Sequence, residues 1–217
     1  LVKGGAINYN EYIISLENCY FKNNSATYGG AIYTELMNNI DMCSFENNNA
    51  IEAGNEIFFN GTGNLKLTNC NFSRCISNEG SWFIAYNNIN SLTIDACNFI
   101  NCSSRGNGGA IFLKDDLTYT IVNSYFEGNK ATNGGVIYSK MKTFSCNNCT
   151  FANNQADYGG AIYVERVSTI GITDCTFINN YATDGGAFYS NQANFKCDNC
   201  NFTENRAKSG GAIYVIN

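Results

Sequence analysis

The 217-residue sequence contains no histidine and no proline, and only 14% of its residues are charged. The lack of histidine excludes a Ser-His or Cys-His catalytic pair and an imidazole metal ligand. The net charge of −5 and the lack of a basic run argue against a nucleic-acid-binding protein that neutralises phosphates. No stretch approaches 18 consecutive apolar residues, so the sequence predicts no membrane-spanning helix.

The ends of the sequence carry no recognisable targeting segment. It starts Leu1-Val2-Lys3, with no Met, no charged n-region and no apolar h-region. A mature protein or an internal fragment would start in the same way. We therefore expect residues 1–217 to form a single repeat array that belongs to a longer chain.

An internal repeat runs through the whole sequence. Its first motif is Gly-Gly-Ala-Ile, and successive copies are 25 to 28 residues apart, starting at Gly4, Gly29, Gly54, Gly80, Gly108, Gly134, Gly159, Gly185 and Gly210. The copies at Gly54 and Gly80 are degenerate. The second motif is Cys-x-Phe-x-x-Asn, and its Phe column is complete: Phe21, Phe45, Phe72, Phe99, Phe126, Phe151, Phe177 and Phe202.

Each period holds three short apolar stretches with alternating residues, separated by Gly, Asn and Asp, which is typical of strands. Three strands per period predict a parallel β-solenoid in which each period is one rung, about 4.8 Å above the last. Right-handed crossover is the strong default. The sequence therefore predicts an all-β fold, a right-handed parallel β-helix of about eight rungs with three short strands each.

The unusual composition agrees with a solenoid. Proline would delete a ladder hydrogen bond in a strand that is flanked on both sides. The 37 asparagines suit corners, where Asn tolerates the left-handed conformation and can bond to the Asn of the next rung.

The two motifs together resemble the repeats of the chlamydial polymorphic outer membrane protein family. Similar repeats occur in large surface proteins of some protists, and the resemblance covers essentially the whole chain. It implies a right-handed parallel β-helix that is exposed at the cell surface and often adhesive. The chain departs from the chlamydial pattern in its cysteine-rich rungs and six glycosylation sequons, which favours a secreted eukaryotic, protist-like protein.

The position two residues before each motif Phe forms a cysteine column, in which Ser124 is the one exception: Cys19, Cys43, Cys70, Cys97, Cys149, Cys175 and Cys200. One interpretation is a stack of small buried apolar side chains. The other is disulfide bonding, for which rungs 4.8 Å apart are close enough. The candidates are the consecutive-rung pair Cys75 and Cys102, the within-rung pairs Cys146 with Cys149 and Cys197 with Cys200, and the column members Cys19, Cys43, Cys70 and Cys97. Eleven cysteines leave at least one unpaired within the chain.

The two Cys-x-x-Cys pairs superficially resemble a zinc site. They lie two rungs apart, at roughly 9.6 Å on that spacing, and one ion with Zn–S bonds near 2.3 Å cannot bridge them. We therefore predict no metal and no cofactor.

Six Asn-x-Ser/Thr sequons are candidate glycosylation sites: Asn60, Asn71, Asn201, Asn23, Asn101 and Asn148. In a chain this rich in Asn, several would arise by chance. Asn71 and Asn201 lie between an inward Cys and an inward Phe, which directs them outward, and Asn60 falls in a loop. These three are the best candidates.

The position after Gly-Gly-Ala-Ile forms an aromatic column: Tyr33, Phe58, Phe112, Tyr138, Tyr163, Tyr189 and Tyr214. The preceding Ile column should face inward. The Ala column tolerates Glu56 and Trp82, which predicts that it faces outward with the aromatic column. The aromatic column either stacks to stabilise the solenoid or binds another chain or sugar rings.

Three function classes compete on this evidence. The first is a non-catalytic extracellular structural or adhesive solenoid that self-associates, end to end into a filament or laterally. The second is a pectate-lyase-like carbohydrate-active enzyme, for which the only acidic pair, Asp115 and Asp116, points apart along a strand. The third is a glycan-binding module that uses the aromatic column. We favour the first class, with no catalytic residues and no nucleic-acid partner, because a scaffold needs repetition and no chemistry.

Overall fold

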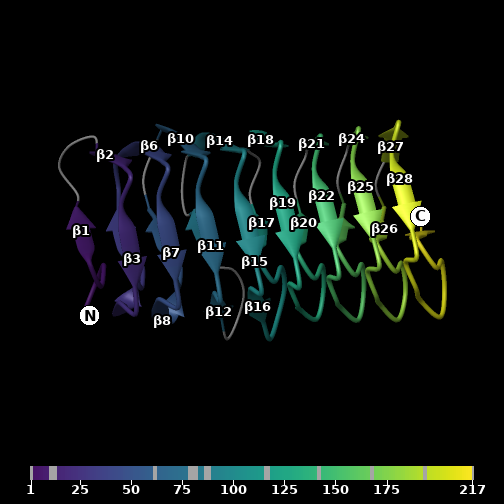
Figure 1. Cartoon of the computed structure of the whole chain (residues 1–217), viewed down its shortest axis with the longest axis horizontal. Coiled ribbons are helices and arrows are strands. Elements are labelled where there is room, and N and C mark those ends of the chain that lie inside the picture. Colours follow the sequence, from purple (N-terminus) through teal and green to yellow (C-terminus); the bar gives the residue numbers. More distant parts are fainter. Residues whose placement is uncertain are drawn as a thin grey trace.

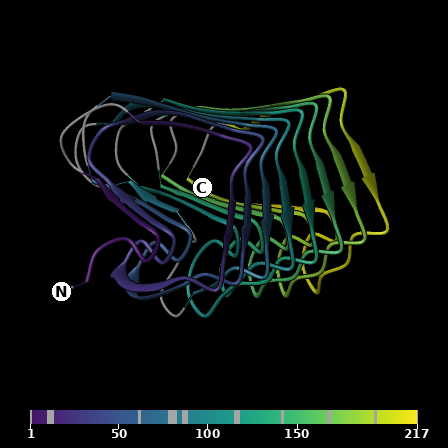
Figure 2. The same ribbon diagram turned by 60° about the vertical axis from the view of Figure 1, so that its left-hand side comes forward.

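A computed structural model describes residues 2–9, 14–60, 63–77, 83–85, 89–114, 118–140, 143–166, 169–192 and 195–216. All of its regular elements are short strands that pair in parallel with the strand one repeat away. Figure 1 shows the strands side by side along the long axis, in chain order from one end to the other. In the turned view of Figure 2, successive turns of the coil nest behind one another.

Two eight-stranded sheets run the length of the coil without a break. The first sheet consists of β2 (Ile14–Glu17), β6 (Met37–Asp41), β10 (Gly63–Thr68), β14 (Ile89–Asp95), β18 (Thr118–Val122), β21 (Thr143–Asn147), β24 (Thr169–Thr173) and β27 (Phe195–Asp198). The second consists of β3 (Tyr20–Lys22), β7 (Ser44–Glu46), β11 (Asn71–Ser73), β15 (Asn98–Ile100), β19 (Tyr125–Glu127), β22 (Thr150–Ala152), β25 (Thr176–Ile178) and β28 (Asn201–Thr203).

The third sheet is divided into two parts. Its first part contains β1 (Ile7–Tyr9), β5 (Ile32–Thr34), β9 (Ile57–Phe59) and β13 (Phe83–Ala85). Its second part contains β17 (Ile111–Lys114), β20 (Ile137–Lys140), β23 (Ile162–Glu165), β26 (Phe188–Asn191) and β29 (Ile213–Ile216). The prediction of an all-β parallel solenoid with three strands per rung is confirmed, and the eight-stranded sheets correspond to about seven full turns.

A fourth side of each rung carries only fragments of strand. Here lie β4 (Ser25–Tyr28), which pairs with β8 (Asn49–Ala53), and β12 (Ile76–Ser77), which pairs with β16 (Ser103–Ser104). Further along the chain this side continues as single bridges from Ser103 through Lys130, Gln155 and Tyr181 to Arg206. We call it the fourth corner.

The core is organised around the Phe column of the second sheet. All neighbouring rings of the column stack, with centroids 4.7–5.1 Å apart and planes within 13° of parallel. Six of the eight phenylalanines are at most 1% exposed. Burying one such ring contributes about 2 kcal/mol, and stacking adds roughly 1 kcal/mol. This column therefore holds the register of the solenoid.

The corners explain the asparagines. One left-handed residue precedes each member of the cysteine column, and a second lies two residues after each motif Phe, with φ between 50° and 65° throughout. Most of these positions are Asn, the residue other than Gly that adopts this conformation at least cost. The predicted corner role of Asn is confirmed.

A buried asparagine ladder lies next to the second set of corners and consists of Asn24, Asn48, Asn129, Asn154, Asn180 and Asn205. In Asn129, both the backbone N–H and Nδ2 donate to Oδ1 of Asn154, at 2.9 and 3.0 Å. Nδ2 of Asn154 also donates to the carbonyl of Phe126 at 3.1 Å. A ladder member that follows another Asn thus satisfies backbone and side-chain groups of the rung before it.

Candidate functional site

The aromatic column is stacked, and most of it is buried. Tyr138, Tyr163 and Tyr189 stack with centroids 5.2 and 4.9 Å apart. Tyr33, Phe58, Tyr138 and Tyr189 are at most 8% exposed, whereas Phe112, Tyr163 and Tyr214 are half-buried. The expectation of an open ring surface along this column is therefore wrong for its four buried members. Its geometry agrees with the alternative, stacking that stabilises the solenoid.

The tyrosine hydroxyls are also engaged. The Tyr138 hydroxyl donates to Glu165 at 2.8 Å. Burial, followed by this carboxylate, raises the pKa of Tyr138 above its usual value. The Tyr33 hydroxyl accepts from Lys3 at 2.9 Å and lies 3.1 Å from Glu35.

The Ala column does not face outward as expected. Ala31, Ala110, Ala161 and Ala187 are 0% exposed, and so is Glu56, which occupies the same column. Strand alternation begins only at the Ile, so both positions after the Gly pair are covered. The acidic side chain that suggested exposure is a buried carboxyl. Trp82 lies outside the described residues.

Five of the six sequon asparagines are exposed, and Asn60 is half-buried. Nδ2, the atom that carries an N-linked glycan, donates from Asn60 to the Tyr33 hydroxyl at 3.2 Å and from Asn148 to Asn123 at 2.8 Å. Asn71 and Asn201 use only Oδ1, as acceptors from Asn98 and Thr203. Asn23 likewise accepts from Asn47, and Asn101 stands at a left-handed corner. The geometry favours Asn71 and Asn201 over Asn60, and glycosylation of the six sequons stays a prediction.

The cysteine column serves the first corner of each rung. Each thiol donates to the carbonyl two residues earlier, as Cys43 does to Asp41 at 3.2 Å, and this bond spans the left-handed residue between them. Ser124, the exception in the column, makes the same bond through its hydroxyl at 2.7 Å. The column therefore selects a small side chain with one donor hydrogen.

All eleven cysteines are free thiols in this structure, so the disulfides remain predictions. Thiol pairs close enough to shift each other's pKa include Cys75 with Cys102, Cys70 with Cys97, and Cys197 with Cys200. The backbone N–H of Cys19 points at Sγ of Cys43, 3.4 Å away. Two of the expected pairs, Cys75–Cys102 and Cys197–Cys200, are thus neighbours.

One cluster was not foreseen. The sulfur atoms of Cys146, Cys149 and Cys175 all lie within 4.8 Å of one another, and all three residues are buried. We call them the thiol triad. Cys175 was missing from the disulfide candidates, although it lies 26 residues after Cys149 and hence one rung above it. Within the described ranges, this is the only group of three or more cysteine or acidic side chains close enough to hold a metal ion.

Hydrogen bonds and burial shift the pKa values of the thiols in the triad in opposite directions. Bonds from Cys146 and Cys149 hold the pKa of Cys175 well below its usual range. Burial, followed by the bonds to Cys149 and Cys175, raises the pKa of Cys146 well above that range. Cys175 is therefore the thiol that ionises first.

The fourth corner carries a column of exposed side chains that the sequence analysis missed. Lys130, Gln155, Tyr181 and Arg206 occupy one bridge column and are all exposed; we call them the corner stripe. Tyr181 is 52% exposed. The sequence does carry a trace of this surface, because the residue after each ladder Asn varies between two constrained neighbours, the Asn and a buried Ala.

A groove of about 400 Å³ opens at one end of the corner stripe. Its lining combines apolar, hydroxyl and charged side chains: Ile76, Ser103, Ser104, Arg105, Lys130, Ala131, Thr132 and Asp157. Among the described residues, Arg105 and Lys130 take part in no ion pair. The groove therefore presents two free cations, with hydroxyls beside them.

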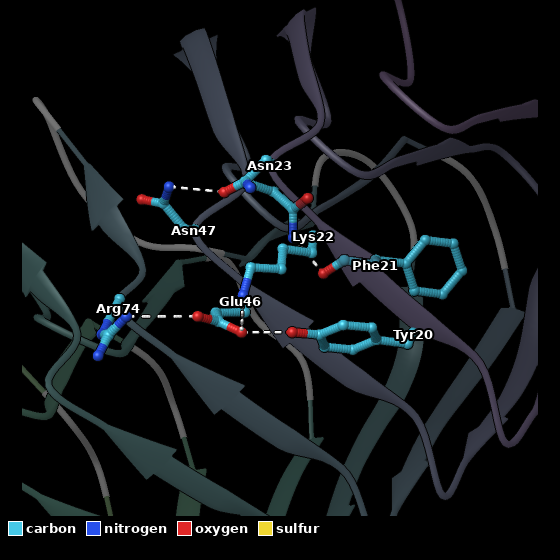
Figure 3. A network of polar contacts seen from close by, with 8 residues as sticks. Tyr20, Phe21, Lys22, Asn23, Glu46, Asn47 and Arg74 are labelled. Carbon is cyan, nitrogen blue, oxygen red and sulfur yellow. Dashed lines mark hydrogen bonds and ion pairs between the residues drawn. The ribbon is translucent and has the colours of Figure 1, made fainter.

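A separate charged network covers the outer face of the second sheet near the N-terminal end. Figure 3 shows Tyr20, Lys22 and Arg74 converging on the carboxylate of Glu46. The hydrogen bonds from Tyr20 and then Lys22 lower the pKa of Glu46. All its charges are mutually paired, and surface pairs of this kind contribute little to stability. The network is a solvated face of the scaffold and leaves no charge free for a ligand.

Three aspartates of the described residues belong to the corners of the coil. Asp41, Asp95 and Asp174 accept hydrogen bonds from corner asparagines. Each carboxylate thus links its corner to the corner of the next rung. Asp115 and Asp116 lie outside the described residues.

Residues 55–217 match the family model of the right-handed beta helix region. The chain belongs to the right-handed beta-helix family. Residues 18–35 match the Chlamydia polymorphic membrane protein repeat, which confirms the repeat type that the motifs resembled. No curated protein and no solved structure matches the chain. Among the described residues, no helix of this beta-helix protein is long and apolar enough to cross a bilayer.

Proposed function

We propose that this beta-helix protein is a non-catalytic, extracellular structural and adhesive solenoid of a cell surface. The observation that carries the proposal is the continuous parallel pairing of its first two sheets over eight strands each, with register shifts at Ile14/Ser15 and Gly63/Asn64 of the first sheet. This pairing repeats most outward positions along a straight line at about 4.8 Å. The match to a membrane protein repeat supports a surface location, and the exposed sequons support a glycoprotein.

The corner stripe is the surface that we assign to adhesion, with a cell-surface glycan as its ligand. Tyr181 offers a half-exposed ring for stacking on the apolar face of a sugar. Gln155 adds an amide, and Lys130 and Arg206 add cationic donors, all exposed. Donors at one per rung suit an extended chain of hydroxyl or carboxylate groups.

Binding of the purified protein to immobilised glycans and whole cells tests this assignment. The double variant Tyr181→Ala/Arg206→Ala should lose most of the binding. The matched control Tyr20→Ala/Arg74→Ala removes an equally exposed Tyr and Arg from the second sheet and should bind like the unmodified protein. Equal binding by both variants would remove the corner stripe from the proposal.

We also propose that copies of the chain self-associate, end to end or laterally. Every rung presents the same strand positions as the rung before it, so the edge of one stack is complementary to the edge of another. Electron microscopy of the concentrated protein should reveal filaments with the rung spacing along their axis. Particles of single-chain mass at all concentrations would contradict self-association.

A second candidate function is that of a carbohydrate-active enzyme on acidic glycans. The observation in its favour is the groove in which Arg105 and Lys130 lie near Asp157, since cations beside a carboxylate suit a uronate substrate. Incubation with polygalacturonan and related glycans, followed by reducing-end detection, separates the two functions. Product formation that Arg105→Ala abolishes would replace the non-catalytic proposal.

A further inference from the structure

The thiol triad joins two rungs in the dry interior of the C-terminal half. Cys146 lies on β21, Cys149 at the corner that follows, and Cys175 at the same corner one rung further on. Sγ of Cys175 is 3.8 Å from Sγ of Cys146, and all three sulfurs lie within 4.8 Å. Each residue is 1% exposed.

The eight cysteines outside the triad lie in four pairs. Cys19 lies beside Cys43, Cys70 beside Cys97, Cys75 beside Cys102, and Cys197 beside Cys200. Four disulfides would use those eight thiols completely. The odd cysteine of the chain then belongs to the triad, which holds three sulfurs where a single disulfide needs two.

We propose that Cys146, Cys149 and Cys175 form a thiol–disulfide exchange site, in which Cys175 bonds alternately to Cys146 and to Cys149. One disulfide and one thiol are always present. The site is a covalent cross-link between two rungs. Its disulfide can move from one cysteine pair to the other and stays in the core. The proposal rests on the sulfur geometry and is independent of the proposed surface role.

Charge favours this assignment over a metal site. Three thiolates around a divalent soft ion would leave a net negative charge in the core. None of the cationic side chains in the described part of the chain is buried, so that charge would lack a partner. One disulfide plus one thiol is neutral and needs no solvation.

Closure of the disulfide consumes an external low-molecular-weight disulfide, such as glutathione disulfide, during folding. The Cys175 thiolate attacks one glutathione sulfur, forms a mixed disulfide and releases one glutathione thiolate. The Cys146 thiolate then attacks the Cys175 sulfur and releases the second glutathione thiolate. One protein disulfide forms, the disulfide of the oxidant breaks, and the two thiol protons pass to the two glutathione thiolates.

Exchange needs no further oxidant. The Cys149 thiolate attacks the Cys175 sulfur, the new bond forms, and Cys146 leaves as a thiolate that takes up the proton released by Cys149. Cys175 is hydrogen-bonded to both other members of the triad and has a lowered pKa, in agreement with its role as the shared disulfide partner. Ser124 already replaces cysteine one rung before Cys149, so serine variants at the corners should fold.

Trypsin separates Cys175 from the other two cysteines of the triad. Cleavage after Lys142, Arg166 and Lys196 gives one peptide with Cys146 and Cys149 and a second with Cys175 alone. The chain is refolded in a glutathione redox buffer, quenched in acid, alkylated and digested without reduction. We expect the two peptides to be disulfide-linked, with fragment ions that show attachment at both Cys146 and Cys149.

Variants complete the test. Cys146→Ser and Cys149→Ser should each retain the linked peptides through the remaining partner, whereas the double variant should lose them. Alkylated Cys175 in the unmodified protein would overturn the proposal, and so would its linkage to another peptide or to only one partner. Three alkylatable thiols with a retained soft metal ion would also overturn it. The fragment ions of the unmodified protein decide the matter even where a variant fails to fold.

Discussion

Two parts of the solenoid share the same repeat but keep its ladders to different degrees. They are the middle, residues 48–104, and the C-terminal part, residues 124–216. In the C-terminal part, the asparagine ladder runs from Asn129 to Asn205 without a gap. In the middle, Cys75 and Cys102 occupy the ladder positions, and the Cys102 thiol lies 4.0 Å from the Phe72 carbonyl. The third sheet is also divided here, between β13 and β17.

The Phe column continues through both parts, so they differ in the corners and in the third sheet. Phe72 and Phe99 stack with centroids 4.7 Å apart, as closely as any pair in the C-terminal part. A buried Phe contributes about 2 kcal/mol, against about 1 kcal/mol for a typical hydrogen bond. The solenoid therefore keeps its core column and lets single corners degrade. Substitutions at equivalent positions of the two parts test this difference.

The second glycine of the Gly pair should give the largest effect. A Cβ at Gly160 would lie 2.0 Å from the Gly186 carbonyl oxygen of the next rung. Backbone cannot move away inside a paired stack, so we expect Gly160→Ala to cost more than about 3 kcal/mol in denaturant unfolding.

Gly171 provides the control, because a Cβ there meets nothing within 4 Å, and Gly171→Ala should be nearly neutral. In the middle part, Asn55 occupies the position of Gly160 and is buried. Asn55→Gly deprives the Ala50 N–H and the Ile76 carbonyl of their partners, so it should cost about 2 kcal/mol, less than Gly160→Ala. Equal losses would mean that the two parts pack their rungs alike.

Glu56 should make the middle part sensitive to pH. Burial raises its pKa from 4.5 to about 7, more than the bonds from Asn48 and Cys75 lower it, and its Oε1 atom has no hydrogen-bond partner. A carboxyl with a raised pKa holds its proton more tightly in the folded state, so folding stability falls as pH rises from 4.5 to 7.

We expect a loss of about 3 kcal/mol across that window, measured as the free energy of unfolding at pH 4.5 and pH 8. The chain has no histidine to titrate in the same range. Glu56→Gln should flatten the profile, whereas the exposed control Glu17→Gln should leave it unchanged. A flat profile in the unmodified protein would place the carboxyl in contact with water.

Asn154 should come next, because its side chain serves two rungs. Asn154→Ala deprives the backbone N–H and Nδ2 of Asn129 of their acceptor and the Phe126 carbonyl of a donor. Buried groups without a partner cost about 2 kcal/mol in such a case. Thermal unfolding should detect the loss, and Asn153→Ala at the exposed neighbouring corner provides a milder comparison.

The sequence predicted the stacked columns of Phe, Cys and Asn, but it missed the buried Ala column and the thiol triad, for a physical reason. Phe, Cys and Asn columns recur at a fixed period, and stacking forces equal environments on equal positions, so the fold follows from spacing alone. The Ala column was misjudged because Glu56 looked like a mark of exposure, while burial depends on neighbours in the adjacent rungs. The thiol triad was missed because Cys146 belongs to the strand column and Cys175 to the corner column, and their sulfurs meet only in three dimensions.

Restoring the ladder in the middle part should give a small gain. Cys102→Asn places an amide below Asn129, whose Oδ1 now accepts only from the backbone N–H of Cys102 at 2.9 Å. The new Nδ2 can donate to that oxygen and to the Phe72 carbonyl, which we expect to stabilise the chain by about 1 kcal/mol. A loss of stability would show that the middle part has repacked around its cysteines.

The smallest effect should come from the cysteine column itself. Cys43 donates to the Asp41 carbonyl at 3.2 Å and accepts from the Cys19 N–H at 3.4 Å. Ser124 reproduces both contacts, at 2.7 and 3.1 Å, in the next part of the chain. In the reduced protein, Cys43→Ser should therefore change the free energy of unfolding by less than about 1 kcal/mol, because a stronger donor offsets the lost apolar sulfur. Cys43→Ala removes the donor from a buried corner and should cost more than the serine variant. If alanine were the milder of the two, the column would be selected for packing and the hydrogen bond would be incidental.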